Sequence, residues 1–518
     1  MSATRSVALA TVATFVGYAV TLLQQVLFAR ALGVDAQTDA LAAALAWGVG
    51  TSGPVGAALA SVALPAYVQA WASGDEQRAR ASIQASAGVG LAAALLLAVV
   101  TFLAADPLSS ALAPGLVGGD RERLAGLLRL TAPLEFLWIL VWLTVARANA
   151  RERYVLAAAS FAIPPVPVIL TFVLSPNATV EEVALAYIFG AALQVALVAA
   201  SVGSLGDLRP SLRSATARRL IRRLIPVGLA FGLMSIAGLV LRGVASLQGP
   251  GAVATADYAS RLVIAGEQII LSGLLAVVFT RWSHEAGAVG SAATVAVAEA
   301  GGAWSVQGAV LRMLGPVIGV AFLLPIVAPP LVAILFQGGR FDAEDAGAVA
   351  RFLGWMSAGV AAHMLVLLAV RALLAAGRFI ILSVVGAVAV VTMWGVGLVA
   401  GSSMGLDGVA LAYAVGWIAA AAVSLLALRV SAPRFASEFG RAILMGAGAA
   451  AITILATQLL PDVAALRLAV VSVAFVLVAT ILGRLLGVTA VREILGRLSG
   501  GRGTVGASTG AGRPGAQP

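Results

Sequence analysis

Long apolar runs recur along this chain about every 30 to 35 residues. Most are close to the ~20 residues that a helix needs to cross ~30 Å of hydrocarbon. Mean hydropathy is +1.01 and only 11% of residues are charged, whereas soluble domains carry about 25%. One water-exposed globule cannot hide so much apolar surface. The sequence therefore predicts an all-α integral membrane protein.

Fourteen transmembrane helices account for these runs. We expect them near residues 7–28, 40–64, 83–105, 127–147, 155–174, 183–205, 224–248, 262–281, 312–336, 348–370, 380–400, 407–428, 442–460 and 466–487. The second contains Gly48, Gly50, Gly53 and Pro54, so it should bend or break. Such a break is either a packing kink or the lining of a wet cavity.

Arginine placement predicts the orientation. With a cytoplasmic amino terminus, about 24 arginines fall on the cytoplasmic side and about 8 outside, and Arg242 lies within a span. Both termini are then cytoplasmic. The stretch from Arg209 to Arg223 holds six arginines and predicts an amphipathic linker at residues 208–223, lying on anionic lipid headgroups. Nucleic acid is a poor alternative partner, because membrane spans flank this stretch.

The residue types that are missing exclude several chemistries. The chain has no cysteine, which removes disulfides and cysteine-based metal sites. It also has no lysine, which removes a P-loop and a Schiff base. We therefore expect no metal and no cofactor. The first helix lacks a cleavage pattern and reads as a retained span, and residues 499–518 read as a disordered tail.

An internal repeat divides the chain into two parts. Val183-Ala184-Leu185-Ala186-Tyr187 recurs at Val409-Ala410-Leu411-Ala412-Tyr413, an offset of 226 residues. Three further echoes follow in the same order, and two of them have offsets of 223 to 225. They pair Arg147-Ala148 with Arg371-Ala372, Pro107-Leu108 with Pro330-Leu331, and, more loosely, Thr38-Asp39-Ala40 with Thr255-Ala256-Asp257.

The repeated unit holds six spans, so both copies enter the membrane in the same direction. The predicted parts are a lobe at 1–207, the linker at 208–223, a second lobe at 224–430, two extra helices at 431–498 and the tail. Two such lobes around a central cavity are typical of alternating-access transporters. This architecture indicates a mechanism class and leaves the cargo open.

The chain resembles the MurJ/MviN family of lipid II flippases, which belongs to the multidrug/oligosaccharidyl-lipid/polysaccharide exporter superfamily. The most specific match is Leu335-Phe336-Gln337-Gly338-Gly339-Arg340-Phe341, after the ninth span. Further matches are Ala29-Arg30 with Gly33, Thr38-Asp39-Ala40, Pro65 with Tyr67, Tyr258-Ala259-Ser260-Arg261-Leu262, and Arg371-Ala372. Together they cover all fourteen spans. The resemblance implies a bacterial plasma-membrane flippase.

The resemblance also implies cavity arginines on the first, second and eighth helices, which would suit a pyrophosphate. Only Arg261 is kept. The first-helix positions read Tyr18 and Gln24, and the second-helix position falls on Thr51 or Ser52. The expected cargo is therefore lipid II, another polyprenyl-linked saccharide or another amphiphile.

Charged and polar residues within spans are the candidates for transport, because burying them in the membrane is costly. For substrate binding we name Arg261, Arg242, Gln24 and Asp39, and for a coupling cation or proton Glu135 and Glu267. Each has a structural alternative. Arg261 could anchor at headgroup level, Asp39 could cap its own helix, and the two acids could pair with the arginines. His363 is more typical of a core hydrogen bond than of a proton relay.

Four functions compete at this point. The leading one is a flippase that moves a lipid-linked cell-wall precursor to the outer leaflet, coupled to a cation or to the membrane potential. A MATE-like drug or metabolite exporter and a non-transporting scaffold of envelope synthesis are the alternatives. An enzyme is disfavoured, because the longest outer loop, around Asp106 to Glu122, has no catalytic cluster of charged groups.

Overall fold

The computed structural model describes residues 3–72, 74–202, 210–267, 306–461 and 463–498. Within these ranges every regular element is a helix, apart from an isolated bridge between Gly338 and Phe341. The predicted tail at 499–518 and His284 lie outside the described residues.

The amino-terminal lobe is built from α1 to α8. Its helices are α1 (Ala3–Leu32), α2 (Ala36–Ala72), α3 (Glu76–Leu103), α4 (Ala105–Leu112), α5 (Gly119–Ala150), α6 (Tyr154–Ala159), the 3-10 turn η1 (Ser160–Ala162), α7 (Pro165–Leu174) and α8 (Val180–Val202). The fifth predicted span is interrupted at η1, where Pro164, Pro165 and Pro167 follow one another closely; proline removes a backbone donor and clashes with the preceding turn. By contrast, α2 continues through Gly48 to Pro54 as one helix.

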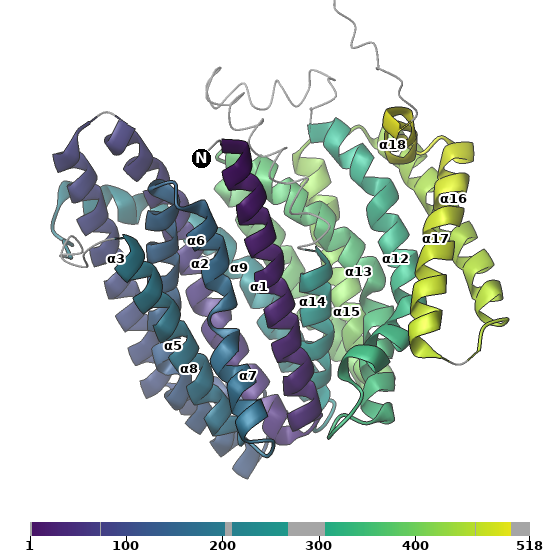
Figure 1. Ribbon diagram of the computed structural model, residues 1–518, viewed down its shortest axis with the longest axis horizontal. Helices are drawn as coiled ribbons and strands as arrows, with labels where there is room; N and C mark the ends of the chain where they lie inside the picture. Colours follow the sequence, from purple (N-terminus) through teal and green to yellow (C-terminus); the bar gives the residue numbers. More distant parts are fainter. Residues whose placement is uncertain (1–2, 73, 203–209, 268–305, 462, 499–518) are drawn as a thin grey trace, which may run out of the picture.

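The carboxy-terminal lobe begins with α9 (Ala215–Ser246). It continues with a helix at 252–267, which we call the eighth-span helix, and with α12 (Val306–Phe336), α13 (Ala343–Ala375), α14 (Phe379–Met404) and α15 (Leu406–Ala427). Three further helices follow: α16 (Ala432–Thr457), α17 (Ala464–Leu486) and the short α18 (Thr489–Leu498). Both α16 and α17 pack on α12, so the added helices extend this lobe on one side (Figure 1).

Twelve helices in the described residues are long and apolar enough to cross a membrane. They coincide with twelve of the fourteen predicted spans. The other two are the second, which is the 37-residue α2, and the eighth, of which only the beginning is described. The predicted all-α membrane fold with about fourteen spans is therefore confirmed.

Two predicted boundaries differ from the structure. The linker at 208–223 is not a separate helix, because α9 begins at Ala215 and runs without a break into the seventh span. Arg218, Arg219, Arg222 and Arg223 are exposed on its first turns, while Ala217 and Leu220 are buried. The eighth span was placed at 262–281, but its helix begins at residue 252.

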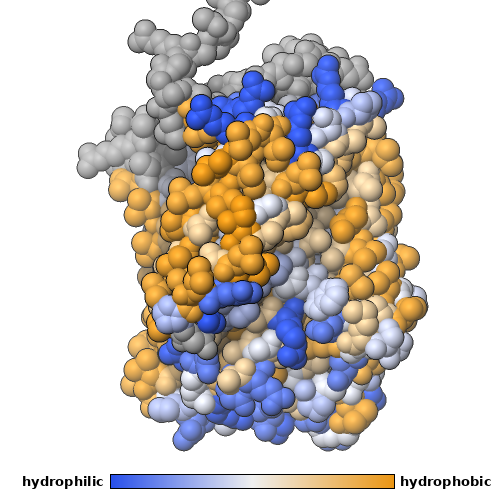
Figure 2. Space-filling view, turned by 90° about the vertical axis from the view of Figure 1, so that its right-hand side faces the viewer, coloured by the Kyte–Doolittle hydropathy of each residue, from blue (hydrophilic) through white to orange (hydrophobic). Residues whose placement is uncertain are grey.

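Apolar side chains cover the outside of the helices. Leu174, Ile380, Leu426 and Leu459 are 78% to 87% exposed, a degree of exposure that lipid rather than water explains. Figure 2 shows apolar side chains over much of one face, with hydrophilic side chains gathered towards its two ends. This distribution is the one expected for a chain that crosses a bilayer.

The two lobes meet at the end that we predict to face outside. The turn after α1 lies against the turn after α12, where the Arg340 backbone N–H donates to the Arg30 carbonyl oxygen (2.8 Å) and the Arg340 side chain pairs with Asp35 (2.9 Å). We call this region, together with the start of the eighth-span helix, the outer contact.

An aromatic cluster fills the outer contact. Tyr258 is 1% exposed and lies within 5.5 to 6.1 Å, centroid to centroid, of the rings of Phe28, Phe336 and Phe341. Phe172 of α7 packs edge-on against Phe28. The Tyr258 hydroxyl donates to the Gly33 carbonyl oxygen (3.0 Å). Edge-to-face aromatic pairs each add about 0.5–1.5 kcal/mol beyond their buried area, so the cluster stabilises closure of this end.

Glycine is required where the two turns touch. Gly339 has φ +61°, and a Cβ on it would lie 2.3 Å from the Arg30 carbonyl oxygen. Because an L-residue in this conformation costs roughly 1–2 kcal/mol before any clash, Gly339→Ala should lower stability by more than that. Gly347→Ala in α13, where the added Cβ meets nothing within 4 Å, is the matched control and should be neutral or stabilising. Thermal unfolding of the purified proteins measures the difference, and equal melting temperatures would contradict this account of the turn.

Candidate functional site

Two arginines and one carboxylate form a buried triad in the carboxy-terminal lobe. From α9, Arg242 donates to Asp257 Oδ1 through Nη2 (2.6 Å) and Nε (3.1 Å), and to the Gly238 carbonyl oxygen (2.9 Å). Arg261 Nε donates to Asp257 Oδ2 (2.5 Å), one helical turn along the same helix. The triad has two positive charges against one negative charge. Asp257 is 4% exposed, and the two arginines are 14% and 20% exposed.

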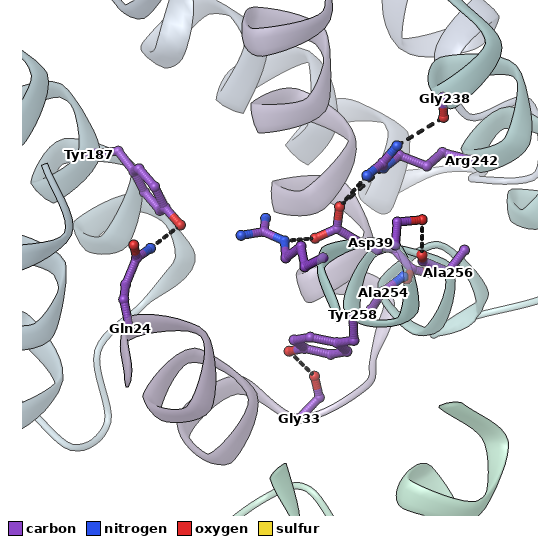
Figure 3. Close-up of polar contacts among 12 residues, drawn as sticks. Gln24, Gly33, Asp39, Tyr187, Gly238, Arg242, Ala254, Ala256 and Tyr258 are labelled. Carbon is purple, nitrogen blue, oxygen red and sulfur yellow. Dashed lines mark hydrogen bonds and ion pairs between the residues drawn. The ribbon is translucent and has the colours of Figure 1, made fainter. Parts of the chain in front are cut away.

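Polar groups of the amino-terminal lobe extend the triad. Tyr187 of α8 lies beside Arg261, and Gln24 of α1 donates to the Tyr187 hydroxyl. The Arg261 guanidinium carbon is 5.6 Å from the centroid of the Phe28 ring, also on α1, in a cation–π arrangement. Figure 3 shows Gln24 and Tyr187 pointing towards each other on one side and Arg242 reaching in from the other. The site therefore spans both lobes.

Two cavities meet at Arg261. One, of about 340 Å³, is lined by Tyr187, Arg242, Asp257 and Arg261, and α2 forms another part of its wall. The other, of about 200 Å³, is lined by Arg261 together with Tyr18 and Gln25 of α1. The Gln25 Oε1 atom is buried without a hydrogen-bond partner. The guanidinium of Arg261 thus lies between two hollows in which a phosphate oxygen could reach it.

Of the predicted binding residues, Arg242 and Arg261 lie together at the larger cavity, and Gln24 supports them through Tyr187. Gln24 does not line either cavity, whereas its neighbour Gln25 does. The hydroxyls of Thr51 and Ser52 donate to carbonyl oxygens of α2, to those of Trp47 and Gly48 respectively. They take no part in the site.

Asp39 has a different role from the predicted one. Its side chain is fully buried, and its two oxygens accept hydrogen bonds from the backbone N–H groups of Gly251 (2.7 Å) and Ala254 (2.6 Å). It therefore caps the eighth-span helix of the other lobe, not its own helix, and both oxygens are engaged with backbone. The structure places Asp39 in the outer contact and away from both cavities.

The two buried acids also differ from expectation. Neither Glu135 nor Glu267 pairs with the arginines, because Asp257 does so. Glu135 is 1% exposed and accepts a hydrogen bond from the Thr101 hydroxyl (2.6 Å), which in turn accepts from the Trp47 indole (2.8 Å). The second oxygen of Glu135 has no partner among the described residues. Glu267 lies 2.7 Å from His363 Nδ1.

The sequence reading missed Asp257, Tyr187 and the pairing of Glu267 with His363. Asp257 could have been found, because an acid four residues before an arginine on a helix is a standard ion-pair spacing. The other partners come from helices 96 to 163 residues apart in the chain, and no local pattern reveals them. Within the described residues no cluster of three or more His, Asp or Glu could hold a metal ion.

Comparisons with known proteins agree with this architecture. A family model described as lipid II flippase MurJ matches residues 9–485. Among solved structures, the chain is similar to a lipid II flippase MurJ in an inward closed conformation. The TM-score is 0.75 at 16% identity, over 95% of this chain and 99% of that one.

Two further solved structures share the fold. The chain is similar to a multidrug resistance MATE family transporter of the MOP superfamily in an inward-facing conformation (TM-score 0.63, 16% identity, 80% of this chain and 93% of that one). It is also similar to a MOP superfamily transporter from Pyrococcus furiosus (TM-score 0.59, 15% identity, 82% and 94%). No curated protein sequence matched.

Fold and site together define a multi-pass membrane transporter of two helical lobes, with a charged site where the lobes face each other. Within that class, the family model covers nearly the whole chain. The chain belongs to the lipid II flippase MurJ family.

Removing the Asp39 carboxylate should open the outer contact. A lost N-cap costs about 0.5–2 kcal/mol, and here that loss falls on a contact between lobes. Because the chain has no cysteine, Thr255→Cys gives a single probe at a position that is 2% exposed. Labelling of this probe by a membrane-impermeant maleimide should rise when Asp39→Ala is added. A probe at exposed Ser402 is the control and should label equally in both backgrounds, and an unchanged Thr255→Cys rate would remove Asp39 from the closure.

Proposed function

We propose that this chain is an alternating-access flippase that moves a lipid-linked saccharide, lipid II or a related polyprenyl-linked precursor, to the outer leaflet. The observation that carries the proposal is the cationic triad of Arg242, Asp257 and Arg261 at a cavity bordered by both lobes. The family supports the same class of cargo.

The triad suits the diphosphate of such a lipid. A guanidinium presents a planar fork of donors that matches phosphate oxygens, and charge-assisted hydrogen bonds are roughly twice as strong as neutral ones. Arg242 supplies from α9 a positive charge that the family places on the first and second helices. The site therefore keeps two arginines, although only Arg261 matches the family motif.

Asp257 prepares the site for an anion. Without it, two buried guanidinium groups would repel each other, and each would lack an acceptor. With it, the free site is held in one geometry at a net charge of about +1. An arriving diphosphate offers more acceptor oxygens than one carboxylate and takes over donors that Asp257 does not occupy.

An apolar cavity offers room for the lipid part. It has a volume of about 630 Å³ and lies between α12, α13, α15 and α16, and of the residues that line it only Ser357 is polar. It shares no lining residue with the two cavities at Arg261. A chain held there would leave the diphosphate free to reach the triad.

The proposed orientation follows from the arginines of α9. Exposed Arg213, Arg218, Arg219, Arg222 and Arg223 lie at the start of this helix and would contact anionic headgroups of the cytoplasmic leaflet. We place the protein in the bacterial plasma membrane with both termini in the cytoplasm. A cation or the membrane potential would drive the transport cycle.

The alternatives make different demands on the site. A MATE-like exporter of cationic drugs would face a net positive triad, which repels such cargo, although an anionic metabolite would remain compatible. A scaffold of envelope synthesis would need no cavity arginines. Substitution of the triad therefore separates transport from scaffolding.

Complementation of a strain depleted of its essential lipid II flippase tests the proposal. Arg261→Ala should abolish rescue and Arg242→Ala should reduce it, because each lost charged hydrogen bond costs about 1.5–3 kcal/mol, or roughly 10- to 150-fold. Arg129→Ala is the control: this arginine is 39% exposed and pairs with Asp106 away from both cavities.

A further variant separates lost binding from misfolding. Combining Arg242→Ala with Asp257→Asn removes the arginine without leaving a buried carboxylate unpaired. It should restore protein levels but not rescue. Failure of the wild-type chain at normal expression would exclude lipid II as cargo, and full activity of Arg261→Ala would exclude the triad as the binding site.

A further inference from the structure

The eighth-span helix carries three contacts along one rod. Its amino-terminal backbone is held by Asp39 of the other lobe, its middle carries Asp257 and Arg261, and residue 267 carries a carboxylate that pairs with α13. At 1.5 Å per residue, Glu267 is about 9 Å along the helix axis from Arg261. The contact at Glu267 is therefore placed to influence the other two.

The Glu267–His363 pair is buried and closely bonded. Glu267 Oε1 lies 2.7 Å from His363 Nδ1, and their side chains are 3% and 17% exposed. The imidazole ring also lies against Trp417 of α15, with ring centroids 4.1 Å apart. Indole faces stabilise an imidazolium as they do other cations. The pair thus joins three helices of the carboxy-terminal lobe through the one side-chain type that titrates near neutral pH.

We propose that Glu267 and His363 form a proton-binding site whose occupancy sets the position of the eighth-span helix and so couples proton movement to the transport cycle. This inference rests on the proposed alternating-access function. It assigns the coupling ion, which the architecture alone does not.

The proton balance is simple. With one proton the pair is neutral overall and is held by the hydrogen bond between Nδ1 and Oε1. Uptake of a second proton gives an imidazolium beside a neutral carboxylic acid, with a net charge of +1. The Coulomb attraction between the two groups is then lost, and the link between the eighth-span helix and α13 weakens.

Weakening this link frees the end of the helix that lies farthest from the Asp39 cap. The helix can then tilt about its capped end and carry Asp257 and Arg261 with it. Release of the proton on the other side of the membrane would restore the link. Substrate site and proton site thus move as one rigid element.

The surroundings of the pair favour this assignment. From the packed helices, the other titratable or charged groups are Arg261 and Asp257 on the same helix, Tyr413 on α15, and Arg371 two turns farther along α13. Among the described residues, no other acid or base is hydrogen-bonded to Glu267 or His363. Glu135, the other buried acid, is bonded only to Thr101 and has no titrating partner there.

Histidine NMR tests the site directly. The chain has two histidines, so a sample labelled at histidine gives two ring signals, and His284→Gln assigns them. We expect the His363 signal to titrate between pH 5 and 9. Its midpoint should move by about one pH unit or more in Glu267→Gln, since one unit reflects about 1.4 kcal/mol of interaction. A midpoint that Glu267→Gln leaves unchanged would overturn the pairing.

A distance measurement tests the coupling. Spin labels at Gln77→Cys in α3 and Ala432→Cys in α16, both exposed and both at predicted cytoplasmic ends, report how far the lobes are apart. In nanodiscs, lowering the pH from 8.5 to 5.5 should change the ratio of the two lobe distances at least about fivefold, the lower limit of ordinary allosteric coupling. Glu267→Gln and His363→Gln should each abolish this response.

The control is Glu438→Gln. Glu438 is a similarly buried acid, in α16, bonded to the backbone N–H of Thr489 and paired with Arg441. This variant should keep the pH response. A response that survives in both Glu267→Gln and His363→Gln would overturn the proposal. Neither measurement uses a lipid substrate, so failure here and failure of complementation are separate results.

Discussion

The capping of the eighth-span helix by Asp39 is the contact on which much of the outer end depends. Two backbone N–H groups of one lobe donate to a fully buried carboxylate of the other. In hydrocarbon such N–H groups have no water to bond, so the carboxylate both satisfies them and fixes where the lobes meet. The aromatic cluster around Tyr258 and the glycine turns at Gly33 and Gly339 pack around this fixed point. The outer end closes through polar backbone contacts sealed by rings.

Most of the fold could be predicted from the sequence, because apolar runs of about 20 residues and a repeat of about 225 residues both survive in the amino acids. The boundaries that failed share a cause. Residues 252–261 contain Asp257, Ser260 and Arg261, so their hydropathy resembles a loop, yet the polar groups satisfy one another inside the lobe. The linker prediction failed because a helix does not end where charge begins: the backbone hydrogen bonds of α9 continue through its exposed arginines.

The site could be predicted only in part. Arg242 and Arg261 were identified because charge within a span is rare, and their location at one cavity agrees with that logic. Asp39 was identified for the same reason, but burial cost cannot distinguish a ligand from a cap. The partners that turn single charges into a site are Asp257 for the arginines and His363 for Glu267. They depend on how helices pack, and one sequence without relatives does not reveal that packing.

The continuity of α9 has a consequence for the membrane itself. From Arg222 to Arg242 the helix advances 20 residues, or about 30 Å, which is close to the thickness of the hydrocarbon layer. One rigid rod therefore links a ring of headgroup-seeking arginines at one leaflet to a cavity arginine near the opposite leaflet. Such a rod works as a ruler: bilayer thickness sets how deeply the triad sits. The lipid composition of the host membrane becomes a physical parameter of the binding site.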